Sequence, residues 1–254
     1  MTATLVARNT FREVTRDRLL IGVLAAAAVI LAGTQLLTPL ALGEGLRLTV
    51  DLGLSGISLL GMFVILVVGT SLVAKELERR TIYNLLSRPI ARPSYLVGKW
   101  LGLVSVLWVV TAAMAAGLWF LVALRGQPGH GPALMQAAYL AGLELSVMTA
   151  LAVMFSALST PVLSALYTLG MFVIGQWTYD LRAYAQQAPP MLRHLLEVAA
   201  NVAPNLPLFN LRTLASEGQL AGWDHIGLAT AYAAAYVACV LALGAAAFES
   251  RDFK

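Results

Sequence analysis

Charged side chains are scarce in this sequence. Only 12% of its 254 residues are Asp, Glu, Lys or Arg, whereas 59% are hydrophobic. Soluble globular domains carry about 25% charged residues and about half apolar ones, so the composition excludes an ordinary soluble domain. Cysteine occurs once, at Cys239, which excludes an intrachain disulfide. Basic residues outnumber acidic ones by only 17 to 13 and adjoin the hydrophobic runs, which argues against a nucleic-acid-binding protein.

Sequence motifs that carry catalysis are also missing. The phosphate-binding pattern G-x-x-x-x-G-K-[ST] does not occur, because Gly98 and Lys99 are followed by Trp100 where Ser or Thr is required. The patterns H-E-x-x-H and G-x-S-x-G are absent, and the three histidines lack the spacing of metal ligands. We therefore predict that this chain has no catalytic residue, no metal site and no cofactor of its own.

The hydrophobic residues gather in long runs without charge. Residues 19–43, 52–74, 100–124 and 226–248 each exceed the roughly 20 residues that a helix needs to cross a bilayer. A further run is interrupted by Ser159-Thr160-Pro161, and Pro161 suits the first turn of a new helix. Pro93 likewise suits the first turn leading into the third span.

These runs predict an all-α polytopic membrane protein with one domain over residues 1–254. We expect the first run to stay in the protein, because it is about ten residues longer than the core of a usual signal peptide. The prediction is six transmembrane helices, over residues 19–42, 52–74, 100–124, 137–158, 162–178 and 226–248.

The distribution of basic residues predicts the orientation. Five lie in the loops on one side: Arg47, Arg125, Arg182, Arg193 and Arg212. The other twelve lie at the two termini and between the second and third spans: Arg8, Arg12, Arg16, Arg18, Lys75, Arg79, Arg80, Arg88, Arg92, Lys99, Arg251 and Lys254. Cytoplasmic loops carry the excess of Lys and Arg, so both termini and the loop over residues 75–99 are predicted to be cytoplasmic.

Two segments outside the spans have amphipathic patterns. In residues 4–18, apolar side chains are interleaved with arginines, which predicts an N-terminal interfacial helix on the anionic inner membrane surface. The apolar members are Leu5, Val6, Phe11 and Val14.

The external segment over residues 179–225 is the largest loop, and it contains a second such helix between the prolines at 189–190 and 204. This helix either lies in the outer interface or folds back between the spans. Its apolar stripe comprises Met191, Leu192, Leu195, Leu196, Ala199 and Val202.

Residues 74–99, AKELERRTIYNLLSRPIARPSYLVGK, hold eight charged residues and two prolines. Thr81 suits a helix N-cap, and Pro89 ends the short helix that follows. Ile82, Leu85 and Leu86 share one face of this helix. Membrane anchoring would explain the basic residues alone but not the acids, the cap and the apolar stripe. We therefore expect the apolar face to bind the membrane surface or a groove in another protein.

The stretch KELERRTIYNLLSRPIARPSYLVGKWLG closely resembles the loop between the second and third spans of ABC-2 type transporter permeases. It is nearest the branch that includes the nitrous-oxide-reductase maturation and gliding-motility permeases. The start RNTFREVTRDRLL, the late segment APNLPLFNLRT and the six-span layout are also similar. The loop residues that carry the resemblance are Glu76, Glu78, Thr81, Ile82, Leu85, Leu86, Ser87, Pro89, Arg92, Gly98 and Lys99.

The resemblance implies that residues 74–89 form a coupling helix seated in a groove of a cytoplasmic ABC ATPase. The implied docking residues are Glu76, Glu78, Arg79, Arg80, Thr81, Ile82, Tyr83, Leu85, Leu86 and Arg88. ATP and Mg²⁺ would bind to the ATPase, and this chain would be the permease subunit that moves a substrate, by export. Other implied partners are a second permease copy or a homologous permease, and membrane lipid. The implied location is the bacterial inner membrane.

One acidic residue lies inside a predicted span. Glu144 is about seven residues into the fourth one, roughly 10 Å from its external end. An intramembrane acid indicates either a substrate path or a polar contact between helices, here with Gln176 or Tyr179 of the next span. The sequence leaves both interpretations open.

Residues at two other places bear on how the predicted spans pack. Gly98 and Gly102 allow close helix packing at the start of the third span. Tyr232 and Tyr236 share one face of the last span, where packing against lipid is sufficient to explain them.

Two other functions remain as alternatives. The large external segment is compatible with a non-transporting scaffold, or mechanotransmitter, that conveys the motion of an ABC ATPase to an external partner. A secondary transporter is the less favoured alternative, because such proteins more often show internal repeats or several intramembrane charges.

Overall fold

The computed structural model describes residues 2–16, 18–37, 44–72 and 92–249. Within these ranges the regular secondary structure is entirely helical, as predicted. The elements in chain order are α1 (Thr2–Thr15), α2 (Arg18–Leu37), α3 (Gly45–Val67), η2 (Gly69–Ser71), α6 (Arg92–Leu124), η3 (Pro128–His130), α7 (Gly131–Leu158), α8 (Pro161–Gln176), α9 (Thr178–Ala185), α10 (Pro190–Val202), η4 (Leu206–Phe209), α11 (Arg212–Ser216) and α12 (Trp223–Glu249).

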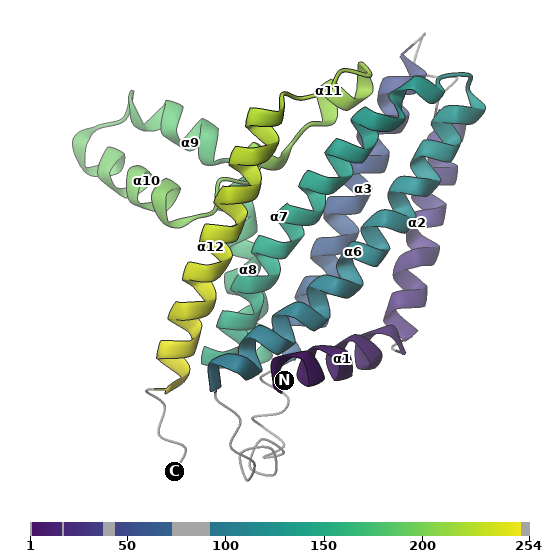
Figure 1. Ribbon diagram of the computed structural model, residues 1–254. Helices are drawn as coiled ribbons and strands as arrows, with labels where there is room; N and C mark the ends of the chain where they lie inside the picture. The colour runs from purple at the N-terminus through teal and green to yellow at the C-terminus, as the bar shows by residue number, and fades with distance from the viewer. Residues whose placement is uncertain (1, 17, 38–43, 73–91, 250–254) are drawn as a thin grey trace.

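Six of these helices, α2, α3, α6, α7, α8 and α12, form a bundle (Figure 1). Helix α7 lies at its centre and packs against α3, α6, α8 and α12. In the most apolar stretch of α7, 83% of the residues are buried, against 39% for α6 and 28% for α12. The outer helices therefore present apolar side chains outward, as expected where lipid is the solvent.

The two ends of the bundle differ (Figure 1). The first, called the α1 end, holds α1, the end of η2, the start of α6 at Arg92, the turn between α7 and α8, and the end of α12 at Glu249. The second, called the α11 end, holds the start of α3 at Gly45, η3 and α11. Successive bundle helices alternate in direction between these two ends.

Four helices are long and apolar enough to cross a bilayer by themselves: α3 with η2, α6, η3 with α7, and α12. Helices α1 and α2 meet at an angle of 61° and pass the same test as a bent pair, which gives a fifth span. Helix α8 is apolar but has only 16 residues, or about 24 Å, less than the roughly 30 Å of hydrocarbon. By length and composition the described part of the chain thus has four or five candidate spans, and the six predicted spans are not confirmed.

Helices occupy most of the described part of each predicted range, and three of them begin at least six residues before the predicted spans do, among them α3, which begins at Gly45 and not at residue 52. Helix α6 begins at Arg92 and α7 at Gly131, whereas the predicted spans begin at residues 100 and 137. A charge-free run underestimates a helix that continues past a buried lysine, as α6 does past Lys99, which is 2% exposed. Pro93 and Pro161 lie in the first turns of α6 and α8, as predicted.

Glycines let the bundle helices approach α7 closely. A Cβ atom at Gly61 of α3 would overlap the side chain of Leu145 on α7, and one at Gly142 of α7 would lie 3.0 Å from the Trp108 ring of α6. Small residues favour such contacts in membranes, where helices associate through packing and not through the hydrophobic effect.

Helices α9 and α10 project sideways from the bundle (Figure 1). The external helix predicted between the prolines at 189–190 and 204 is confirmed as α10. Ala200 is buried at 1% exposure, whereas Met191 and Leu195 on the apolar stripe are 88% and 64% exposed. Much of this apolar stripe is therefore not packed against any other described part of the chain.

The prediction for Tyr232 and Tyr236 of α12 needs correction. The hydroxyl of Tyr232 accepts a hydrogen bond from the backbone N–H of Asn205 (2.9 Å), and the hydroxyl of Tyr236 donates one to the carbonyl of Val202 (3.1 Å). These tyrosines therefore hold the chain that leaves α10 and are not explained by packing against lipid alone.

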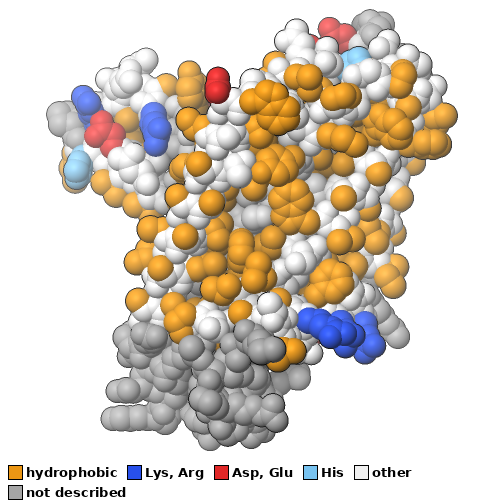
Figure 2. Space-filling model, viewed as in Figure 1, with side chains coloured by type: hydrophobic (Ala, Val, Ile, Leu, Met, Phe, Trp, Pro, Cys, Tyr) orange, Lys and Arg blue, Asp and Glu red, His pale blue; other side chains and the backbone are white. Residues whose placement is uncertain are grey.

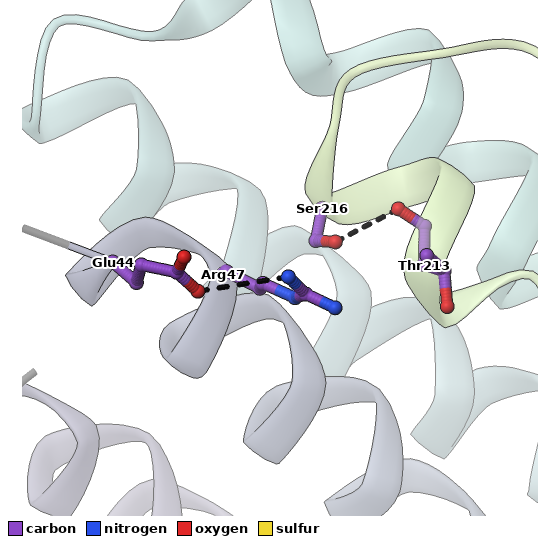
Figure 3. Close-up of polar contacts among 4 residues, drawn as sticks. All are labelled: Glu44, Arg47, Thr213 and Ser216. Atoms are coloured by element: carbon purple, nitrogen blue, oxygen red, sulfur yellow. Dashed lines mark hydrogen bonds and ion pairs between the residues drawn. The ribbon is translucent and has the colours of Figure 1, made fainter.

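Helix α11 packs beside the start of α3 (Figure 3). There Arg47 forms an ion pair with Glu44 at 3.6 Å, and the hydroxyl of Ser216 donates to the carbonyl of Thr213 at 2.8 Å. Both charged side chains are more than half exposed, so the pair contributes little to stability. Burial of Ala215, which is 1% exposed, holds α11 in place instead.

Candidate functional site around Glu144

Glu144 lies halfway along α7, which has 28 residues. At 1.5 Å per residue, its Cα is about 20 Å from either end of the helix. The sequence placed it only about 10 Å deep because the predicted span began six residues too late. Its side chain is 5% exposed, so a carboxyl group is buried near the middle of the bundle.

Both oxygens of the Glu144 carboxyl group accept a hydrogen bond. The hydroxyl of Ser58 on α3 donates to Oε2 at 3.0 Å, and Nε2 of Gln176 on α8 donates to Oε1 at 2.6 Å. A buried carboxyl group without partners is costly, and these donors offset that cost. The contact joins α3, α7 and α8. Tyr179, the other partner considered from the sequence, is 76% exposed.

The end of α8 brings Gln176 to this depth. Helix α8 stops at Gln176, and the chain over residues 203–212 packs beyond its end. Gly175 makes the fit possible, since a Cβ atom there would lie 2.9 Å from the carbonyl oxygen of Pro204. The hydroxyl of Thr178 donates to the carbonyls of Gly175 (2.8 Å) and Pro204 (3.4 Å). Residues 203–212 include only a short 3₁₀ turn, η4, and such backbone is tolerated at membrane depth where protein surrounds it.

A small cavity lies against the carboxyl group of Glu144. It holds about 10 Å³, close to the space of one water molecule. The polar residues that line it come from α3, α7, α8 and the segment leading into α11: Ser58, Glu144, Gln176, Asn210 and Arg212. An acid, a base, a hydroxyl and two amides thus face one space inside an apolar bundle. This arrangement can bind a water molecule or a polar group of a substrate.

The predicted ATPase-docking residues, Glu76 to Arg88, lie outside the described residues. The structure does place the chain on either side of them. Leu72, just after η2, and Arg92, at the start of α6, both lie at the α1 end of the bundle.

A close junction between α1 and α6 also lies at the α1 end. Gly98 and Gly102 of α6, expected from the sequence to allow a close helix contact, face α1. Lys99 between them is buried, with its Nζ 4.0 Å from Oε2 of Glu13 on α1 and 5.8 Å from the centre of the Tyr95 ring. Sequence reasoning found the glycines but not the pairing of Lys99 with Glu13.

Two of the three histidines, His130 and His225, pack against other parts of the chain. Nε2 of His225 lies 3.0 Å from the carbonyl oxygen of Leu208, and the ring of His130 packs on Gly218, whose φ of 69° favours glycine. In the part of the chain that the structure describes, no group of three His, Cys, Asp or Glu side chains could hold a metal ion.

Sequence reasoning missed Ser58, Asn210 and Arg212 as members of the Glu144 cluster. Serine is common in membrane helices, so Ser58 did not stand out. Asn210 and Arg212 belong to the segment over residues 179–225, which was predicted to lie outside the membrane. A signal was nevertheless present, because residues 204–212, PNLPLFNLR, combine prolines with large apolar side chains and polar residues.

Comparison with known proteins agrees with this architecture. Residues 4–253 match the family described as ABC-2 family transporter protein, which covers nearly the whole chain. No curated protein matches the sequence. The family match extends from α1 through the Glu144 cluster to the end of α12. The chain therefore belongs to the ABC-2 transporter family and is a membrane permease subunit of an ABC transporter.

Proposed function

We propose that this permease couples ATP hydrolysis by a separate nucleotide-binding subunit to the export of a substrate across the bacterial inner membrane. The observation that supports the proposal most is the family match over residues 4–253. In this proposal the chain works beside a second copy or a homologous permease, and ATP and Mg²⁺ bind only to the ATPase.

The proposed orientation puts the α1 end in the cytoplasm. Arg8 and Arg12 of α1, and Arg16 directly after it, lie at that end and adjoin the hydrophobic bundle. The excess of Lys and Arg on cytoplasmic loops supports this orientation. Helices α2, α3, α6, α7, α8 and α12 would then be the six spans, with α8 completed by the packed segment over residues 203–212.

Residues 74–89 would dock into a groove of the ATPase through Leu85 and its apolar neighbours. Helix α6 follows this loop directly and has 33 residues, about 50 Å of continuous helix. A displacement of the docked loop would therefore reach the α11 end through α6. The ATPase can bias the permease only if its contacts differ between two states, and closure around ATP supplies that difference.

The Glu144 cluster would have two roles in this cycle. In the arrangement described here, Ser58 and Gln176 make Glu144 a polar contact between three helices. If α8 and residues 203–212 separate from α7 during transport, the same polar groups would line the substrate path. The small cavity beside them supports this role.

A second candidate function is mechanotransmission without transport. It is favoured by the α9–α10 hairpin, which projects from the bundle and exposes an apolar stripe on α10 (Figure 1). In that case the hairpin would convey ATPase motion to an external partner.

The docking role is tested by co-expressing the chain with its neighbouring open reading frames and identifying an ABC ATPase that co-purifies. We expect the two to co-purify, and we expect Leu85→Asp to release the ATPase while the permease stays folded. Leu195→Asp on the exposed stripe of α10 is the matched control and should retain the ATPase. Co-purification that survives Leu85→Asp contradicts the docking role. ATP-dependent solute movement in liposomes then separates transport from mechanotransmission.

A further inference from the structure

Helix α1 is fixed to the bundle along one side only. A Cβ atom at Gly98 of α6 would lie 2.8 Å from the carbonyl oxygen of Ala3, and one at Gly102 would lie 2.8 Å from that of Ala7. Val14, one turn further along this side, is 2% exposed. The packed side is thus made of Ala3, Val6, Ala7, Thr10 and Val14.

Three arginines lie on the opposite side of α1. Arg8 and Arg12 lie in α1, and Arg16 is in the turn directly after its last residue, Thr15; their spacing of four residues puts them on one side of a helix with 3.6 residues per turn. All three are exposed, and their side chains have no ion-pair or hydrogen-bond partner among the described residues. Glu13, the one acid of α1, has its Oε2 4.0 Å from Nζ of Lys99. We call Arg8, Arg12 and Arg16 the arginine stripe.

The position of the arginine stripe indicates that it lies at the membrane surface. Figure 2 shows the Lys and Arg side chains over α1 at the border where the hydrophobic surface of the bundle ends. Leu5 lies on the same side of α1 and is 67% exposed, and Ile21, in the first turn of α2, is 69% exposed. Guanidinium groups next to exposed apolar side chains are typical of a helix at the membrane interface, where lipid phosphate groups adjoin the acyl chains.

We propose that the arginine stripe binds the phosphate groups of anionic phospholipids. Because α1 packs on Gly98 and Gly102, bound lipid would also fix the depth of the start of α6. Guanidinium groups suit this ligand, since they bind phosphate oxygens in pairs. The proposal requires that the chain lie in a membrane, which its family establishes, but it requires no ATPase and no particular orientation.

The test is lipid binding to the purified full chain, measured by native mass spectrometry during titration with phosphatidylglycerol or phosphatidylcholine. We expect phosphatidylglycerol to bind more tightly, and 0.5 M salt to reduce that preference. Each basic residue near an anionic surface contributes about a fivefold gain, so Arg8→Gln/Arg12→Gln/Arg16→Gln should weaken phosphatidylglycerol binding about a hundredfold. Arg8→Lys/Arg12→Lys/Arg16→Lys should retain most of the binding.

The matched control removes three exposed arginines from outside the stripe, as Arg47→Gln/Arg182→Gln/Arg193→Gln. It should leave phosphatidylglycerol binding unchanged. An equal loss in both triple variants, or no preference for phosphatidylglycerol in the unmodified chain at low salt, overturns the proposal. So does a stripe variant that binds lipid normally but loses a co-purifying ATPase, because the stripe would then dock a protein. The salt titration needs no variant and decides the question if the triple variant fails to fold.

Discussion

Gln176 and Glu144 meet where α8 ends against the middle of α7, with Nε2 of Gln176 2.6 Å from Oε1 of Glu144. The contact lies at the depth where α8 ends and the segment around η4 packs beyond it. A polar pair at a helix end can separate with less rearrangement than one held between two continuous helices. This position suits a contact that forms in one state of a transporter and opens in another.

Substituting Glu144 tests whether it acts as more than a structural contact. Glu144→Gln keeps the size of the side chain but removes its charge, so we expect ATP-dependent transport in liposomes to fall more than the yield of folded protein. Glu144→Leu leaves the donors of Ser58 and Gln176 unpaired, so it should also lower the free energy of unfolding by about 1–3 kcal/mol.

The control for the two Glu144 variants is Glu197→Gln on α10, which removes a surface carboxylate that pairs with Arg193. It should change neither transport nor the free energy of unfolding measurably. Transport unaltered by Glu144→Gln would exclude the substrate-path role and leave the polar contact alone.

Gly102→Ala should displace α1. The new Cβ atom would lie 2.6 Å from Cβ of Thr10 and 2.8 Å from the carbonyl oxygen of Ala7, so one of the helices must move. Overpacking of this kind costs about 1–3 kcal/mol, and we expect faster amide hydrogen exchange confined to α1. Gly170→Ala on α8 is the control, since no atom lies within 4 Å of its Cβ position. Equal exchange in α1 for both variants would show that the junction tolerates a methyl group.

Removing the hydroxyls of the α12 tyrosines should loosen the chain after α10. Tyr232→Phe and Tyr236→Phe each delete one hydrogen bond to residues 202–205, and each should lower the free energy of unfolding by about 0.5–1.5 kcal/mol. Hydrogen exchange at the amide of Asn205 should rise in Tyr232→Phe. Tyr179→Phe, at a side chain 76% exposed, should have no effect. If all three variants behave alike, lipid contact explains the α12 tyrosines after all.

The sequence was sufficient to predict the helical class, the helix between the prolines flanking α10 and the turn at Pro161. These features depend on local signals, because hydrophobic runs and prolines act on the residues next to them. The end of α8 could not be predicted in this way. It depends on residues 203–212 filling the space beside Gly175, a contact between segments nearly 30 residues apart.

The candidate site was predicted in part. Glu144 stood out because a carboxylate is rare in a membrane span, and the span to which Gln176 belongs was known from its hydrophobic run. Its depth was wrong because the predicted span began at residue 137, whereas α7 begins at Gly131. Ser58 and Arg212 could not be assigned, because only the packing of α3 and the external segment on α7 brings them to the cavity.

The sidedness of the segment between η2 and α6 tests the central claim most directly. In a Cys239→Ala background, Ser87→Cys would report on the proposed docking loop, and Gln219→Cys, exposed at the α11 end, would report on the opposite side. With a membrane-impermeant maleimide on intact spheroplasts, the account predicts labelling of Cys at position 219 and none at position 87 until the cells are lysed. Labelling at position 87 in intact spheroplasts would put the loop outside the cell and contradict coupling to a cytoplasmic ATPase.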